Sequence, residues 1–137
     1  MKRMHIHVGV DDLTQSVEFY SALFGSNPDK LKSDYARWLL DDPRVNFAIS
    51  TTIETRGVEH LGLQVDSNEE LEGVRTRLKQ ADQTLYGEGE TTCCYANSDK
   101  SWVRDPSGVA WESFMTHSDA DEYFGKEQPA TSEWACC

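Results

Sequence analysis

His5-Ile6-His7-Val8-Gly9-Val10-Asp11 and His60-Leu61-Gly62-Leu63-Gln64-Val65-Asp66 are two copies of one pattern in a chain of 137 residues. In each copy, a histidine stands five positions before a valine that is followed by aspartate. Apolar residues alternate with polar residues or glycine, which predicts a β-strand with one apolar face in each copy. Similar elements follow both strands, so we infer an internal repeat of roughly sixty residues.

A helix with start and stop signals follows each of these strands. Asp12 can cap the first helix, and Gly25 can end it. Ser67 and Glu70 form a capping box for the second helix, which we expect to extend to about Ala81. Both segments have one apolar face that can cover a sheet, formed by Leu13, Val17, Tyr20, Leu23 and Phe24 in the first and by Leu71, Val74 and Leu78 in the second.

The remaining segments of both copies have strand and turn patterns. We expect strands at residues 35–40, 45–51, 84–88, 101–104 and 109–115, with a hairpin turn at residues 97–99. The sequence therefore predicts an α+β fold in which two βαβββ modules form one cupped mixed sheet with both helices outside. The domain is expected at residues 1–116, with modules at about 1–54 and 55–116, before a polar tail at 117–137 that ends in Cys136-Cys137. The modules could pair within one chain or between the two chains of a homodimer.

Charge and composition exclude several classes of partner. The formal net charge is -11 at pH 7, whereas nucleic acid and anionic membrane surfaces require a basic face. No apolar run is long enough to span a membrane, and the residues after Met1 lack the apolar region of a secretory signal. We therefore expect a cytoplasmic protein with reduced thiols and a small-molecule ligand.

Strand alternation places metal-binding types of side chain on one face of the predicted sheet. When the helix covers the apolar face of the first strand, His5 and His7 point the other way, and His60 does so in the second copy. Glu112 lies in an apolar strand, where a carboxylate without a partner is costly. His5, His60 and Glu112 would form a two-histidine, one-carboxylate set suited to non-haem Fe(II) and O₂ chemistry. Each could alone be a satisfied polar residue on a half-exposed strand, but the matched spacing in the two copies favours a joint site.

The adjacent cysteines Cys93 and Cys94 suggest a second kind of ligand site. In a regular strand, neighbouring side chains point to opposite faces, so both sulfurs reach one ligand only where the backbone is irregular. Gly87 and Gly89 precede the pair, and we expect them to form a mobile loop that closes over the cup. The pair would then offer two thiolates to one soft, thiophilic centre. The alternative is one buried and one exposed cysteine without a shared ligand.

Several motifs resemble those of the vicinal oxygen chelate superfamily, which includes glyoxalase I, the extradiol dioxygenases and the bleomycin and fosfomycin resistance proteins. The motifs are residues 5–13, 16–20, 60–62, 105–108 and Trp111-Glu112. Within that superfamily, residues 91–96 followed by 99–103, together with the terminal cysteine pair, are similar to the ArsI carbon-arsenic lyases and the related cadmium-induced proteins. The resemblance extends from Met1 to about Thr116.

This resemblance implies oxidative cleavage of the carbon-arsenic bond of trivalent organoarsenicals, with Fe(II) and O₂, to leave arsenite. Iron would be bound by the two histidines and the glutamate, and Ni, Co, Zn or Cd could replace it. Cys93 and Cys94 would bind As(III), because soft thiolates prefer a soft centre. His7 would line the substrate site or serve as a reserve metal ligand. The charge of Lys100 would favour the thiolates or a reduced oxygen species, although it could also be an exposed hairpin lysine.

Three rival functions come from other classes of protein. A protein that sequesters cadmium or arsenite would need the cysteines but not O₂. A glyoxalase-like isomerase or thiol transferase would use its metal as a Lewis acid and would normally take a fourth ligand from the first module, where residues 45–51 offer no carboxylate. A metal-free drug-binding protein would have no use for the histidines and Glu112. Consumption of O₂ distinguishes the lyase from all three.

Overall fold

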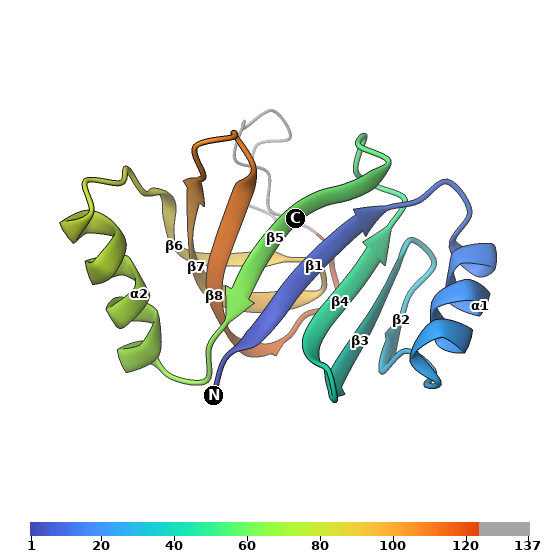
Figure 1. Cartoon of the computed structure of the whole chain (residues 1–137). Coiled ribbons are helices and arrows are strands. Elements are labelled where there is room, and N and C mark those ends of the chain that lie inside the picture. Colours follow the sequence, from blue (N-terminus) through green and yellow to red (C-terminus); the bar gives the residue numbers. More distant parts are fainter. Residues whose placement is uncertain (124–137) are drawn as a thin grey trace.

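The chain folds into one curled, mixed sheet with a helix near each end (Figure 1). This computed structural model describes residues 1–123. Within them, the eight strands lie in the order β2-β3-β4-β1-β5-β8-β7-β6. The predicted α+β fold of two βαβββ modules is confirmed.

Each module contributes one helix and four strands. The first module contains β1 (Arg3–Gly9), α1 (Leu13–Phe24), β2 (Lys30–Leu31), β3 (Tyr35–Asp41) and β4 (Arg44–Ser50). The second contains β5 (Gly57–Gln64), α2 (Asn68–Gln80), β6 (Tyr86–Cys93), β7 (Ala96–Arg104) and β8 (Ala110–Asp119). Among the described residues, no helix is long and apolar enough to cross a membrane.

The helix ends form as their capping residues predict. The Asp12 side chain accepts a hydrogen bond from the backbone N–H of Gln15, and Gly25 ends α1 in a left-handed conformation with a φ of 66°. The Ser67 side chain accepts from the backbone N–H of Glu70 at the start of α2. These bonds satisfy amide groups that the first turn of a helix leaves without partners.

The apolar face of β1 packs under α1, as predicted. Val8, Trp38, Phe47 and Ile49 belong to a buried cluster of the first module. The face of α1 that packs against this cluster consists of Leu13, Val17, Tyr20 and Phe24. Because α1 covers this side of the sheet, the histidines of β1 point into the cup.

The two modules join through β1 and β5 within one chain. These strands run antiparallel, while each runs parallel to the last strand of its own module, β4 or β8. His7 pairs with His60 across the junction, and His5 pairs with Gly62. The junction therefore brings the two copies of the repeat side by side; a homodimer remains a prediction.

Three local predictions are wrong in the second module. The β6–β7 hairpin turns at Cys94-Tyr95, with Cys93 paired to Ala96, and not at residues 97–99. Residues 87–90 lie in strand β6 and do not form a loop. Strand β8 continues to Asp119, past the predicted strand end at residue 115, while the domain boundaries stay a prediction. Residues 124–137 of the predicted tail, with Cys136-Cys137, lie outside the described residues.

Gly62 allows β5 and β8 to approach each other beside the cavity. A Cβ atom added at Gly62 would lie 2.5 Å from the backbone oxygen of Glu112. We predict that Gly62→Ala lowers the free energy of unfolding by about 1–3 kcal/mol, because these strands cannot separate without loss of their ladder. Denaturant unfolding measures this change. Gly73→Ala in α2 is the control: its nearest neighbour would be Arg77 at 3.6 Å, and we expect a gain of about 0.5–1 kcal/mol from helix propensity.

Candidate metal and thiol site

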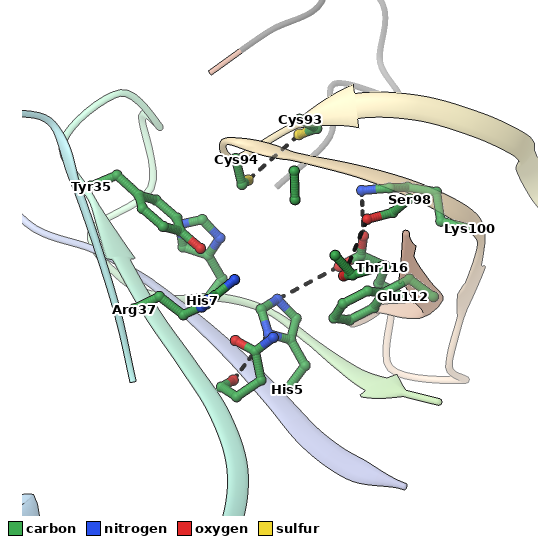
Figure 2. Close-up of a pocket in the computed structure, with 13 residues that line it drawn as sticks. His5, His7, Tyr35, Arg37, Cys93, Cys94, Ser98, Lys100, Glu112 and Thr116 are labelled. Atoms are coloured by element: carbon green, nitrogen blue, oxygen red, sulfur yellow. Dashed lines mark hydrogen bonds and ion pairs between the residues drawn. The ribbon is translucent and has the colours of Figure 1, made fainter. Parts of the chain in front are cut away.

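A cavity inside the cup collects side chains from both modules (Figure 2). Its volume is about 30 Å³, and its lining includes six of the seven predicted site residues, all except His60. The six are His5, His7, Cys93, Cys94, Lys100 and Glu112. His60 lies directly beside them, with its Nε2 atom 3.0 Å from Nε2 of His5.

Two imidazoles and one carboxylate lie close together at the cavity wall. Nε2 of His5 and Nε2 of His60 lie 3.0 Å apart. Oε2 of Glu112 lies 3.3 Å from the His60 nitrogen and 3.6 Å from the His5 nitrogen. Metal bonds of about 2.1 Å that meet near right angles would place their donor atoms about 3 Å apart. These three atoms are therefore spaced to bind one small divalent cation.

The hydrogen bonds of both rings direct their lone pairs into this space. Nδ1 of His5 lies 3.0 Å from the backbone oxygen of Asn46, which can only accept, so Nδ1 carries the proton. Nδ1 of His60 donates to the Glu59 carboxylate. In the neutral rings, both Nε2 atoms are then acceptors that face each other. Two lone pairs in this arrangement require a cation or a shared proton between them, which supports a metal site.

A β-bulge explains how Glu59 reaches the ring of its neighbour His60. His7 pairs with His60 and Val8 with Val58, so Glu59 is an extra residue on β5. A bulge interrupts the alternation of side chains, and it lets two successive residues lie close together. Glu59 was not predicted as a site residue, because a sequence pattern of strict alternation places it on the opposite face.

Burial and neighbouring charges perturb the pKa values of the three groups in different directions. Burial, followed by the His60 ring, lowers the pKa of His5 to about 4. Burial also opposes the charged form of His60, but hydrogen bonds to Glu112 and Glu59 outweigh it and raise the pKa of His60. Burial would raise the pKa of Glu112, yet the Lys100 ammonium and the His60 hydrogen bond hold it far below its usual range. The cluster thus presents an ionised carboxylate to two imidazoles, of which His60 binds a proton more readily than His5.

His7 is the alternative third ligand, because suitable donor atoms of His5, His7 and His60 lie within 4.8 Å of one another. However, Nε2 of His7 is 2.8 Å from the Ser50 hydroxyl, which holds the ring on the β4 side. Among residues 1–123, its buried Nδ1 has no hydrogen-bond partner. Oε2 of Glu112 lies 3.3 Å from the His60 nitrogen and 3.6 Å from the His5 nitrogen, so we favour Glu112 as ligand and His7 as a polar lining residue.

The first module has no counterpart of Glu112. In the second module, Gly62 on β5 pairs with Glu112 on β8. When the two copies are aligned at His5 and His60, His7 on β1 matches Gly62. The β4 residue that pairs with His7, and so matches Glu112, is Ala48. Ala48 is fully buried and offers no ligand atom. A metal bound here would therefore have the three predicted protein donors, with coordination positions left for other ligands.

Lys100 is buried and is not an exposed hairpin lysine. Its Nζ atom lies 2.6 Å from Oε1 of Glu112, and only 4% of the residue is exposed. This ion pair occupies one oxygen of the carboxylate and leaves Oε2 facing the histidines. Lys100 therefore orients Glu112 and adds a positive charge to the cavity wall.

The hairpin turn brings the two cysteine sulfurs together. Cys94 and Tyr95 have φ angles of 51° and 58°, a left-handed backbone that costs about 1–3 kcal/mol for each non-glycine residue. The sulfur atoms of Cys93 and Cys94 lie 3.5 Å apart, and both residues are buried. This separation exceeds the disulfide bond of about 2.05 Å, so they are not bonded to each other. Neither Cys93 nor Cys94 is a free thiol in this structure, so the prediction of reduced thiols is wrong for the state that it shows.

The cysteine pair lies on one side of the cavity, and His5 and Glu112 lie on the other (Figure 2). The irregular backbone that both sulfurs need is thus present, although the turn and not a glycine loop provides it. Arg37 on β3 also lines the cavity and was missed. The sequence around Arg37 shows only strand alternation. Its place at the cavity depends on the curvature of the sheet, which the sequence does not reveal.

Comparison with known proteins agrees with this geometry. The family model described as Glyoxalase/Bleomycin resistance protein/Dioxygenase superfamily matches residues 2–113. The chain belongs to this superfamily. The expected resemblance to it is therefore confirmed.

Two relatives in this superfamily match the predicted branch. A trivalent organoarsenical cleaving enzyme of Bacillus sp. (strain MD1) is 44% identical over 125 residues, which cover 89% of this chain and 78% of that protein. The cadmium-induced protein CadI of Mycobacterium bovis is 35% identical over 124 residues, which cover 90% of this chain and 82% of that protein.

A solved structure shows the same superfamily fold. The Mn(II)-bound glyoxalase from Novosphingobium aromaticivorans has a TM-score of 0.62 and 16% sequence identity, over 92% of this chain and 44% of that chain. At this level of identity, the likeness concerns the fold alone.

The choice between Glu112 and His7 as third ligand is testable with Co(II). We predict that Glu112→Gln weakens Co(II) binding by at least about tenfold, whereas His7→Ala changes it by less than about threefold. Isothermal titration of the metal-free protein measures both affinities. Because Glu112→Gln leaves Lys100 without its carboxylate, a Glu112→Gln/Lys100→Gln double variant provides a second reading. Strong Co(II) binding in both Glu112 variants, with loss in His7→Ala, would contradict the assignment.

Proposed function

We propose that this protein cleaves the carbon-arsenic bond of trivalent organoarsenicals in an Fe(II)- and O₂-dependent reaction that releases arsenite. The observation that carries this proposal is the hairpin turn that places two cysteine sulfurs 3.5 Å apart on the cavity that contains His5 and Glu112. Soft and hard donors thereby face one small space. The 44% identity to a trivalent organoarsenical cleaving enzyme supports the same substrate class.

Reduced Cys93 and Cys94 would bind the arsenic atom. Bonds of about 2.3 Å to two sulfurs, meeting near a right angle, would set the sulfurs about 3.3 Å apart. The observed 3.5 Å requires only a small adjustment. The thiols must be reduced before binding, which agrees with the expected cytoplasmic location.

Fe(II) would be held by His5, His60 and Glu112, where it would supply the activation of O₂. Asn46 and Glu59 keep Nε2 of both rings directed at this position through the Nδ1 hydrogen bonds. Glu112 keeps one oxygen there because Lys100 binds the other. Binding of the cation would displace any proton shared by the two rings.

Two further side chains would act on the substrate from the cavity wall. The Lys100 ammonium would favour the thiolate form of the cysteines before arsenic binds. His7, held by Ser50, would present its ring to the organic substituent or to an oxygen on arsenic. The buried hairpin above them would exclude water from the bond that breaks.

Sequestration of cadmium or arsenite is the second candidate. The 35% identity to a cadmium-induced protein favours it, and it would use the cysteines without O₂. A Lewis-acid isomerase is less well supported, because Ala48 stands where a fourth ligand from the first module would lie.

Oxygen consumption tests the proposed reaction. We predict that the reduced, Fe(II)-loaded protein consumes O₂ with methylarsonous acid and releases arsenite, measured with an oxygen electrode and by arsenic speciation. Cys93→Ser and Cys94→Ser should each reduce the rate by at least about 100-fold, because one thiolate cannot hold the arsenical in a defined position. Co(II) affinity should stay within about threefold of that of the unchanged protein, since neither sulfur is part of the metal set.

The result also distinguishes the alternatives. Tight arsenic binding with no O₂ uptake would contradict the lyase and indicate sequestration. Near-native turnover in either serine variant would show that the two cysteines do not form the substrate site.

A further inference from the structure

The β6–β7 hairpin turn has a backbone that needs external support. Cys94 and Tyr95 are both left-handed, whereas two-residue turns of this kind usually contain Asn-Gly or another glycine pair. Such a conformation persists only where surrounding contacts hold it. Tyr95 makes such contacts, and its partners lie outside the β6–β7 hairpin.

The side chain of Tyr95 is bound to the first module. Its hydroxyl donates a hydrogen bond of 2.5 Å to Oδ1 of Asp34. Nζ of Lys32 lies 5.2 Å from the centre of its ring, within cation-π range. Tyr35, at the start of β3, packs against the same ring with a centroid distance of 5.7 Å. Three residues at the β2–β3 connection thus contact one side chain of the second module.

The backbone oxygen of Tyr95 is held from two more directions. It accepts a hydrogen bond of 2.7 Å from Nζ of Lys30 on β2 and one of 2.9 Å from the backbone N–H of Ala120 after β8. Lys30 also forms an ion pair of 2.5 Å with Asp119 at the end of β8. The Lys30 side chain is only 9% exposed, so solvent screens this contact weakly.

These contacts link opposite edges of the sheet. β2 is the first strand in the sheet order and β6 is the last. In a flat sheet, strands in these positions would lie about 30 Å apart. The sheet is curled (Figure 1), and its two ends approach each other where Tyr95 contacts Asp34 and Lys30.

We propose that Tyr95 is a positioning residue for the cysteine pair, and that Asp34 and Lys30 of the first module hold it in place. We refer to Tyr95, Asp34 and Lys30 as the clamp. The clamp fixes the turn that sets the 3.5 Å separation of the sulfurs, and it fixes the pair relative to His5 on the opposite module. This proposal rests on the proposed function, because it assigns the clamp a role in arsenical binding by the reduced cysteines.

The test breaks the Tyr95–Asp34 hydrogen bond from each side. Tyr95→Phe keeps the ring and its packing, Asp34→Ala removes the acceptor, and Asp34→Asn keeps an acceptor oxygen. Binding of methylarsonous acid to the reduced, Co(II)-loaded protein is measured by isothermal titration, together with Co(II) affinity and melting temperature. Asn97→Ala is the matched control, because it removes hydrogen bonds with Thr92 and Ser118 within the second module.

We expect Tyr95→Phe and Asp34→Ala each to weaken methylarsonous acid binding by about tenfold, the usual scale for a hydrogen bond to a charged group. Their combination should be no worse than either alone, because both remove the same bond. Asp34→Asn and Asn97→Ala should stay within about threefold of the unchanged protein, and Co(II) affinity should be constant throughout.

Three results would overturn the proposal, and they differ in what else they overturn. Equal binding by the unchanged protein, Tyr95→Phe and Asp34→Ala, with loss in Cys93→Ser, would reject the clamp but keep the two-cysteine site. Equal binding by the unchanged protein and Cys93→Ser would reject both. A fall in melting temperature with unchanged methylarsonous acid affinity would reduce the clamp to a structural brace.

Discussion

The antiparallel pairing of β1 with β5 is the constraint on which the rest of the cavity depends. It places His7 opposite His60 and His5 opposite Gly62, so two copies of one sequence pattern meet on one face of the sheet. Gly62 then lets β8 approach closely enough for Glu112 to reach both rings. A slip of one residue would turn these side chains to the other face, and a larger residue at Gly62 would push Glu112 away.

The two modules have similar folds but contribute different chemistry. The first module provides His5 and the charged residues of the clamp, and the second provides His60, the Lys100–Glu112 ion pair and both cysteines. In a chain with a formal net charge of -11, a buried lysine, Lys100, lines the cavity and pairs with Glu112. Its charge balances that carboxylate and would favour the thiolate form of the cysteines.

Much of the fold could be predicted because the repeat, the helix caps and strand alternation are local signals. They also placed His5, His60 and Glu112 on one face, where the structure brings them together. The turn at Cys94-Tyr95 could not be predicted, since turn propensity favours Asn97 and its neighbours while tertiary contacts of Tyr95 support the strained alternative. Glu59 was missed because a bulge leaves no mark in the sequence. Arg37, Asp34 and Lys30 depend on how far the sheet curls, which sets which edges meet.

The central claim is that one arsenic atom is held by both cysteine sulfurs inside the cavity that also contains the histidines. X-ray absorption at the arsenic edge, on the reduced protein with one equivalent of methylarsonous acid, tests it most directly. We predict two sulfur neighbours at about 2.3 Å, the length of a typical thiolate bond to a borderline-soft centre, and one carbon neighbour. In Cys94→Ser, one of the two sulfurs should be replaced by oxygen. Oxygen neighbours alone in the unchanged protein would contradict the claim.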